Sequence, residues 1–297
     1  MRMKRRILLL PLLLLVVQTS VSHRARADED LFGDNYPHVV ATDGGFQVTS
    51  VSLGDGNSTF WRTTYSPEGK TLTPRHQILE SDANIFARQG GRSDVFHLHE
   101  AAALSPSKNE FGVRLTSSTG EVVRLSPAPF DARVSEPGDC WMNKDSAAFL
   151  WAEPTEDFDS LGNRRQMLHL AFIPRGDPSK PLVKELGWCL VGRMIRASNL
   201  VWARDRLWVA WIQVNSSKTT NLTDTVLSNY DPMTDKVETK SLEEPAQTSD
   251  HPSLATTGDW LCAAWSRVPK GENTMRVFTT FEKLPLHKPA VPGRSHP

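Results

Sequence analysis

The chain has 297 residues, of which 39% are hydrophobic, and its 34 basic side chains balance its 34 acidic ones. A chain of this length buries a core without disulfide staples. The balanced charge excludes the dense basic surface that binds a phosphate backbone, so nucleic acid is not an expected partner.

The N-terminus predicts an export signal. A basic start that includes Arg5 and Arg6 precedes an apolar run over 7–17, which is too short to span a bilayer as a helix. Small residues follow, and we expect cleavage after Ser22 or after Ala27. Cleavage after Ala27 leaves 28 basic and 34 acidic residues, a net charge of −6. The signal predicts a secreted or periplasmic protein without a membrane span.

The mature chain, 28–297, predicts one domain built from repeats. Segment 41–52 aligns with 255–266 without a gap, as A-T-x-G-x-aromatic-x-apolar-x-x-apolar-S. Segments 198–211 and 140–151 supply two more copies, and 84–99 supplies another if two or three residues are inserted. The copies are 48, 52, 60 and 54 residues apart, close to the period of a four-stranded propeller blade.

In chain order, the first repeat predicts four strands, at 39–42, 46–53, 59–65 and 71–79. Their Val, Thr, Leu and aromatic residues suit a pleated surface. Gly, Pro and Asp mark the turns between third and fourth strands, at 66–69, 118–120, 174–177 and 231–235. The fifth repeat has a third strand at 274–281, followed by a proline-rich tail from about 284.

We therefore expect an all-β fold, a β-propeller of about five four-stranded blades. Ring closure hides the sheet edges of such an array. The ring would close between Tyr36 and the proline-rich tail.

The segment from His251 to Ser266 resembles the repeat of secreted, sialidase-like β-propellers that carry BNR (Asp-box) repeats. The Asp box, S-x-D-x-G-x-T-W, has one shortened counterpart at 66–72, with Glu68 and Leu72 replacing Asp and Trp. Sialidases of this family use three arginines, a tyrosine–glutamate pair and an aspartic acid. The chain places no arginine trio by motif and has no tyrosine after Tyr230, so sialidase activity is not expected.

Four acidic residues recur just before the innermost strand of a repeat: Asp34, Asp82, Asp139 and Asp250. Asp34 and Asp250 resemble the aspartates that open blades in five-bladed glycosidases. Glycoside hydrolysis takes two carboxyl groups about 5 to 10 Å apart, and opening loops that meet at one channel mouth would supply them. The competing interpretation is that each aspartate caps a turn through its own backbone.

The tryptophans fall into two groups. The first group occupies one repeated position and is expected in the core: Trp151, Trp211 and Trp265. The second group lies elsewhere and contains the candidate platforms for stacking a sugar: Trp61, Trp141 and Trp188.

Two histidines and three cysteines are the remaining reactive residues. His97 and His99 share one face of a predicted strand and are weak candidates for metal ligands, because no third ligand has a motif position. The three cysteines allow at most one internal bridge and are interpreted as small buried residues: Cys140, Cys189 and Cys262. No motif indicates a cofactor, and the oligomeric state stays open.

Three functions follow from these patterns. The first is binding of a glycan or an extracellular protein at the channel mouth without catalysis. The second is glycoside hydrolysis by two of the opening carboxylates. The third is a structural or assembly role.

Overall fold

The computed structural model describes residues 33–54, 57–83, 96–105, 110–117, 122–124, 136–142, 146–158, 164–174, 181–189, 199–215, 222–242 and 248–285. These residues are almost entirely β-strand, as predicted, and their one α-helix is α2 (Glu80–Ala83). In these ranges no helix is long and apolar enough to cross a membrane. The predicted export signal, 1–27, lies outside them.

The strands follow one another in the order that the repeats predict. Those of the first three repeats are β1 (Gly33–Thr42), β2 (Gly45–Gly54), β3 (Asn57–Tyr65), β4 (Thr71–Ile78), β5 (Phe96–Ser105), β6 (Glu110–Ser117), β7 (Val122–Arg124), β8 (Glu136–Met142), β9 (Ala147–Phe158), β10 (Arg164–Ile173) and β11 (Leu182–Cys189). Those of the last two are β12 (Leu200–Ala203), β13 (Arg206–Asn215), β14 (Leu222–Asp231), β15 (Lys236–Ser241), β16 (Thr248–Thr257), β17 (Trp260–Val268) and β18 (Arg276–Lys283).

The strands pair as antiparallel meanders. The first repeat forms the sheet β1–β4, the second β5–β7 and the fifth β16–β18. The third and fourth repeats share one eight-stranded sheet, because β11 pairs with β13 at Cys189 and Gln213. The described strands therefore form four sheets, none of them closed, and do not establish the predicted count of five separate blades.

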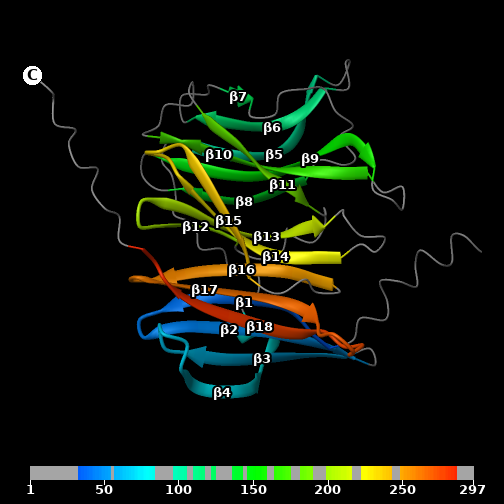
Figure 1. Cartoon of the computed structure of the whole chain (residues 1–297), viewed down its shortest axis with the longest axis vertical. Helices are drawn as coiled ribbons and strands as arrows, with labels where there is room; N and C mark the ends of the chain where they lie inside the picture. Colours follow the sequence, from blue (N-terminus) through cyan, green and yellow to red (C-terminus); the bar gives the residue numbers. More distant parts are fainter. Residues whose placement is uncertain are drawn as a thin grey trace, which may run out of the picture.

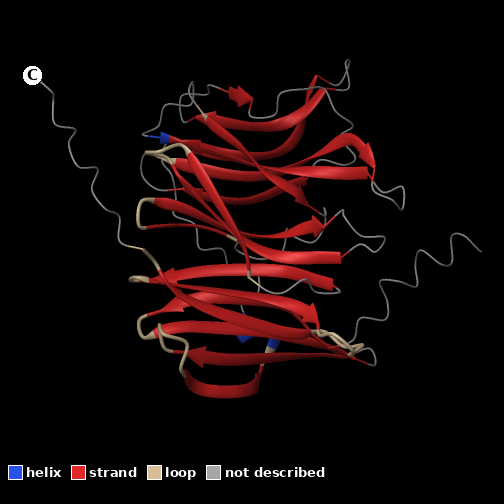
Figure 2. Ribbon diagram, viewed as in Figure 1, coloured by secondary structure: helices blue, strands red, loops and turns tan. Residues whose placement is uncertain are grey.

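The first strands of successive repeats pack on one another. Strand β5 contacts β8, β8 contacts β12, β12 contacts β16, and β16 contacts β1. Figure 1 shows the first and second repeats at opposite ends of the long axis, although they are neighbours in sequence, and Figure 2 shows strands filling the space between. The packing order thus begins at the second repeat, runs through the fifth, and ends at the first.

The first and fifth repeats meet in the region where the predicted ring of repeats would close. Their shared core consists of small and apolar residues from both sheets: Val39, Phe46, Val48, Ala255, Cys262 and Ala264. The amide of Asp34 donates to the carbonyl oxygen of Met275 at 2.9 Å, beside a parallel bridge between Gly33 and Met275. Leu284, at the start of the tail, is buried and donates its amide to the Asp259 carbonyl. The rest of the tail, from 286, lies outside the described residues.

The repeated tryptophans are buried, as expected. Trp151 and Trp211 are fully buried and Trp265 is 4% exposed. The Trp211 indole N–H donates to Ser228 Oγ at 2.9 Å. Its ring lies against Gly187 of β11, where a Cβ atom would be 2.7 Å from the ring. Because Gly187 has no Cβ atom, the third repeat can pack closely against Trp211 of the fourth repeat.

The two cysteines whose side chains the structure describes are buried, as interpreted from the sequence. Cys189 and Cys262 are buried, and burial raises the pKa of the Cys262 thiol. That thiol is consequently a poor nucleophile. The side chain of Cys140 lies outside the described part.

We expect Gly33→Ala to destabilise the junction of the first and fifth repeats. Gly33 has a φ of 126°, and a Cβ atom there would be 2.3 Å from the Met275 carbonyl oxygen. Backbone strain and a clash with backbone should lower the free energy of unfolding by about 2 kcal/mol, as measured by urea denaturation.

The control is Gly44→Ala, where a Cβ atom meets no other atom within 4 Å. Equal stability of the two variants would show that the close approach at Met275 is unimportant.

Candidate functional site

The first strands of the first and fifth repeats open in the same irregular way. Both β1 and β16 contain a register shift, between Asn35 and His38 in one and between Asp250 and Ser253 in the other. In each, the residue before a proline is left-handed: Tyr36 has a φ of 50° and His251 has a φ of 49°. A proline disfavours helical backbone in the preceding residue, so both positions are strained.

Hydrogen bonds hold these two opening segments in place. The Oδ1 atom of Asn35 accepts the Tyr36 amide at 3.0 Å, and Oδ1 of Asp250 accepts the His251 amide at 2.9 Å. Each side chain thus stabilises the strained residue that follows it. Because this contact occurs in both copies, it belongs to the repeat.

The two segments also contact each other. His251 Nδ1 lies 3.0 Å from Asn35 Oδ1 and 3.4 Å from Asp250 Oδ1, and the Tyr36 and His251 ring centroids are 4.1 Å apart. Asn35 and Asp250 are each 6% exposed and His251 is 9% exposed. These four residues, Asn35, Tyr36, Asp250 and His251, are called the junction cluster below.

The geometry of the junction cluster shows that one correspondence between the repeats, inferred from sequence, is wrong. From the sequence Asp34 is expected to correspond to Asp250, but the residue that structurally matches Asp250 is Asn35. The signal was present in the sequence, since Asn35 and Asp250 both stand two residues before a proline. An alignment on the downstream glycines hides this match, because the segments from the proline to the glycine differ in length by one residue between the two repeats.

Asp34 belongs to a neighbouring polar group on one face of the first sheet. Arg75 binds both of its carboxylate oxygens, with Nη1–Oδ2 at 2.5 Å and Nη2–Oδ1 at 2.7 Å. Ser52 donates its hydroxyl to the same carboxylate and accepts the Trp61 indole N–H at 2.7 Å. The Arg75 guanidinium lies 4.3 Å from the centroid of the half-buried Trp61 ring. We call Asp34, Ser52, Trp61 and Arg75 the Asp34 cluster.

The chain joins the two clusters directly, because Asp34 precedes Asn35. Successive side chains of a strand point to opposite faces, so the Asp34 carboxylate lies on the face of β1 opposite Asn35, which contacts His251. Asp34 remains partly open to solvent, with 17% of its side chain exposed. Two of the four predicted carboxylates, Asp34 and Asp250, thus belong to adjoining segments of the first and fifth repeats, which meet through Asn35 and His251.

The other two predicted carboxylates lie elsewhere. Asp139 is buried, and its Oδ2 accepts the amides of Asn199 at 2.9 Å and Leu200 at 3.1 Å. It therefore caps the backbone at the start of the next repeat's first strand, which differs from the expected cap of its own turn. Asp82 is exposed in helix α2, well before β5, and its carbonyl oxygen accepts a hydrogen bond from Arg62.

The remaining predicted site residues divide by what surrounds them. Trp141 stacks on Trp202 at 5.2 Å between ring centroids, so one of its faces is occupied within the protein. Trp188 is half-buried in β11. His97 and His99 lie in β5, but their side chains are outside the described part, and the described residues contain no group of three metal-ligand side chains. The metal prediction therefore stays a prediction.

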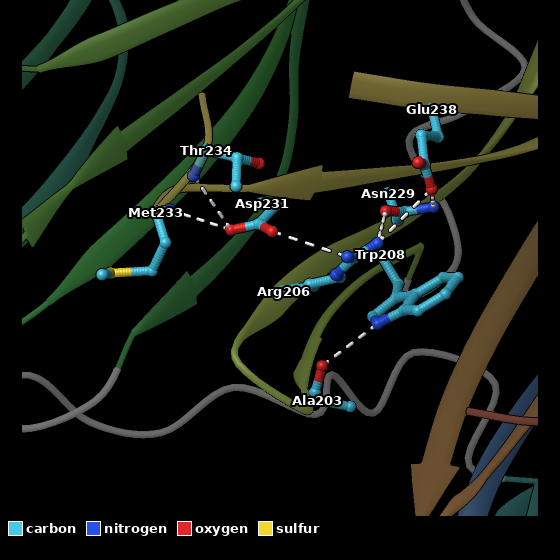
Figure 3. A network of polar contacts seen from close by, with 8 residues as sticks. All are labelled: Ala203, Arg206, Trp208, Asn229, Asp231, Met233, Thr234 and Glu238. Carbon is cyan, nitrogen blue, oxygen red and sulfur yellow. Dashed lines mark hydrogen bonds and ion pairs between the residues drawn. The ribbon is translucent and has the colours of Figure 1, made fainter. Parts of the chain in front are cut away.

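A further polar network lies on the hairpin of β14 and β15 in the fourth repeat (Figure 3). Arg206 Nη1 donates to Asn229 Oδ1 at 2.8 Å and lies 3.4 Å from Glu238 Oε2. Its Nη2 is 3.5 Å from Asp231 Oδ2. The guanidinium thus links three strands of one sheet.

Asp231 also organises the turn between those strands. Its Oδ1 accepts the amides of Met233 at 2.9 Å and Thr234 at 3.3 Å (Figure 3). Burial acts to raise the pKa of the Asp231 carboxyl, but the hydrogen bonds from Met233 and Thr234 and the charge of Arg206 outweigh it and hold the pKa below its usual value. The predicted turn at 231–235 is therefore present and fastened by its first aspartate.

No family model matches the sequence, and no curated protein matches it. The fold is similar to that of a thermostable family-43 glycoside hydrolase, at 9% identity over 86% of this chain and 91% of the other, with a TM-score of 0.39. It is also similar to a glycosyl hydrolase from Bacteroides ovatus, at 11% identity over 86% and 85% of the chains, with a TM-score of 0.38.

A third similar structure comes from work on the GH130 family of mannoside phosphorylases, which contains glycoside hydrolases that target β-1,2 mannosidic linkages in Candida mannan. It is 11% identical over 87% of each chain, with a TM-score of 0.38. Likeness of this degree carries no argument about chemistry. None of these three structures is described as a sialidase.

We expect Asp231→Asn to reduce the acid sensitivity of the fold. Because the folded-state pKa of Asp231 is lowered, its carboxylate stabilises the protein above about pH 4, and this contribution is lost as the pH falls through the folded-state pKa. Asparagine keeps an oxygen that accepts the Met233 amide but does not take up a proton in this range. Urea unfolding at a series of pH values should therefore show a shallower loss of stability below pH 4 in the variant, with a loss of about 1 kcal/mol at neutral pH.

The matched control is Asp43→Asn, in an exposed turn. If wild type and Asp231→Asn lost stability in parallel on acidification, the role of Asp231 in the turn would be wrong.

Proposed function

We propose that this protein is an exported glycoside hydrolase of β-propeller type, acting where its first and fifth repeats meet. The observation that supports this most directly is that the segments carrying Asp34 and Asp250 meet at the junction cluster, through Asn35 and His251. The two segments come from separate parts of the chain, and the packing of β1 on β16 brings them together.

Glycoside hydrolysis requires one carboxyl group that donates a proton to the leaving oxygen and one that acts on the opposite side of the sugar. In this proposal Asp250 donates the proton, since a buried site is typical of such acids. Asp34 activates water or attacks the sugar, and Arg75 fixes its orientation by binding both oxygens. The half-buried Trp61 offers an apolar surface to a sugar ring beside Asp34.

We also propose that the five repeats form a β-propeller. The first strands contact one another in the order β5, β8, β12, β16 and β1, an order that would suit consecutive blades around an axis. The core shared by the first and fifth repeats supplies the junction that a ring needs. In a ring of this kind the opening segments of the first strands gather at one mouth.

Glycan binding without hydrolysis is the second candidate. It is favoured by the hydrogen bonds that both carboxylates already make, Asp34 with Arg75 and Ser52, and Asp250 with the His251 amide. A carboxylate held in this way suits recognition of sugar hydroxyls as well as catalysis.

We expect Asp34→Asn and Asp250→Asn each to lower the rate of glycoside hydrolysis at least about a hundredfold. The substrates are a panel of chromogenic glycosides and polysaccharides that covers the common pentoses and hexoses. Glycan binding is measured in parallel by calorimetry, because amide variants keep their hydrogen-bonding capacity.

Asp82→Asn is the matched control, since it neutralises an exposed aspartate of the first repeat outside both clusters. Hydrolysis that survives in both site variants would refute the assignment of these carboxylates. Binding of a glycan by the wild-type protein without turnover would establish the second candidate. If neither glycoside hydrolysis nor glycan binding were detected, a structural or assembly role would be favoured.

A further inference from the structure

A cavity of about 400 Å³ opens between the fourth and fifth repeats. One wall comes from β13, β14 and β15, and includes Arg206, Asn229 and Glu238. The other comes from the end of β18 and the residues after it, with Glu282 and Lys283 at its edge. Its volume lies in the range of sites that hold small ligands.

The cavity and the Asp34 cluster lie at opposite ends of the fifth sheet. Asp34 is bonded to Met275, just before β18 begins, whereas Glu282 and Lys283 are the last residues of β18. The cavity is therefore separate from the site proposed for hydrolysis. A ligand held there would not compete directly with a substrate at the junction.

The cavity exists because the two sheets pack closely only in their inner parts. There Trp208, Ala210 and Leu227 of the fourth repeat pack on Leu254, Leu261 and Leu284. Farther out, the apolar residues give way to polar ones on the same face of β14 and β15. Within the described residues the fifth sheet has three strands, and the Lys240–Glu282 ion pair joins β15 to the last of them.

The polar side chains of the cavity are arranged in linked pairs. Arg206 contacts Asn229 and Glu238, as Figure 3 shows, and Asn229 Nδ2 lies 3.4 Å from Glu238 Oε2. Lys240 of β15 forms an ion pair with Glu282 of β18 and so bridges the two walls. Donor and acceptor groups therefore alternate along the lining.

We propose that this cavity is a second ligand site, which binds a neutral, hydroxyl-rich ligand, namely a short oligosaccharide. Alternating donors and acceptors on planar side chains match neighbouring sugar hydroxyls, each of which both donates and accepts. Three cationic and two anionic residues line the cavity, and that near balance disfavours a multiply charged anion. The polar lining equally disfavours a wholly apolar ligand.

The geometry also explains how a ligand would be oriented. Trp208 is 4% exposed and donates its indole N–H to the Ala203 carbonyl oxygen at 3.1 Å, so it forms a fixed floor. Glu238, with 68% of its side chain exposed, stands at the open side. A sugar would lie on the floor and exchange hydrogen bonds with Asn229 and Glu238.

The test is calorimetric titration of the full-length mature protein with cellotriose, xylotriose and mannotriose as probes. We expect the double variant Asn229→Ala/Glu238→Ala to weaken binding of at least one probe tenfold or more. The matched control, Glu272→Ala, removes an exposed carboxylate that pairs with Arg276 at the other end of β18 and should change affinity less than twofold. Thermal unfolding of each variant checks that the fold is intact.

A second variant, Trp61→Ala, separates this site from the junction. Binding that persists in Trp61→Ala and is lost in the double variant supports the cavity, whether or not the protein hydrolyses any glycoside. Binding that is lost in Trp61→Ala and kept in the double variant would overturn it, as would failure of all three probes to bind the wild-type protein.

Discussion

The packing of strand β1 on strand β16 is the contact on which the rest of this structure depends. It joins segments more than two hundred residues apart in the chain, Val39 to Ala255 in the core and Asn35 to His251 at the rim. Without it the first repeat would expose Phe46 and Val48, because one face of its sheet has the fifth repeat as its partner. Burial of that face is favourable in proportion to the apolar area removed from water.

The same contact sets the chemistry of the candidate site. Close packing of two sheets is achieved by small residues, Ala255, Cys262 and Ala264, facing the larger ones of the first repeat. At the rim, where the sheets diverge, polar residues replace them. A backbone bulge before each proline then turns Asn35 and Asp250 toward the shared junction. Strained residues in equivalent positions of two repeats are tolerated because a hydrogen bond compensates each.

The repeat also explains why recurring residues are poor guides to function in this fold. Trp151 and Trp211 recur because a blade core needs a large apolar side chain at that position. Asp139 is buried where the first strand of the next repeat begins with backbone amides that need an acceptor. The residues that depart from the pattern are more informative. Asp34 precedes the repeated position and has its own partners, and Arg206 links three strands of a single repeat.

The sequence by itself determined the all-β character, the strand order and the turns at 66–69 and 231–235. The predicted turn at 118–120 and most of that at 174–177 lie outside the described residues. Alternating Val, Thr and aromatic residues and turn residues such as Asp231 are local signals, and local signals can be read along a chain. The strands predicted at 59–65 and 71–79 agree with β3 and β4 to within two residues. The buried position of the repeated tryptophans was predictable for the same reason.

Only the tertiary structure decided where each of the acidic residues lies and which groups it contacts. Asp34, Asp82, Asp139 and Asp250 look equivalent in sequence, yet one caps a neighbouring repeat and one lies in a helix. Their positions depend on how the sheets pack and where a bulge shifts the register by one residue, and neither is encoded by a local pattern. The merging of the third and fourth repeats into one sheet has the same origin, a pairing of Cys189 with Gln213 that joins strands of two different repeats.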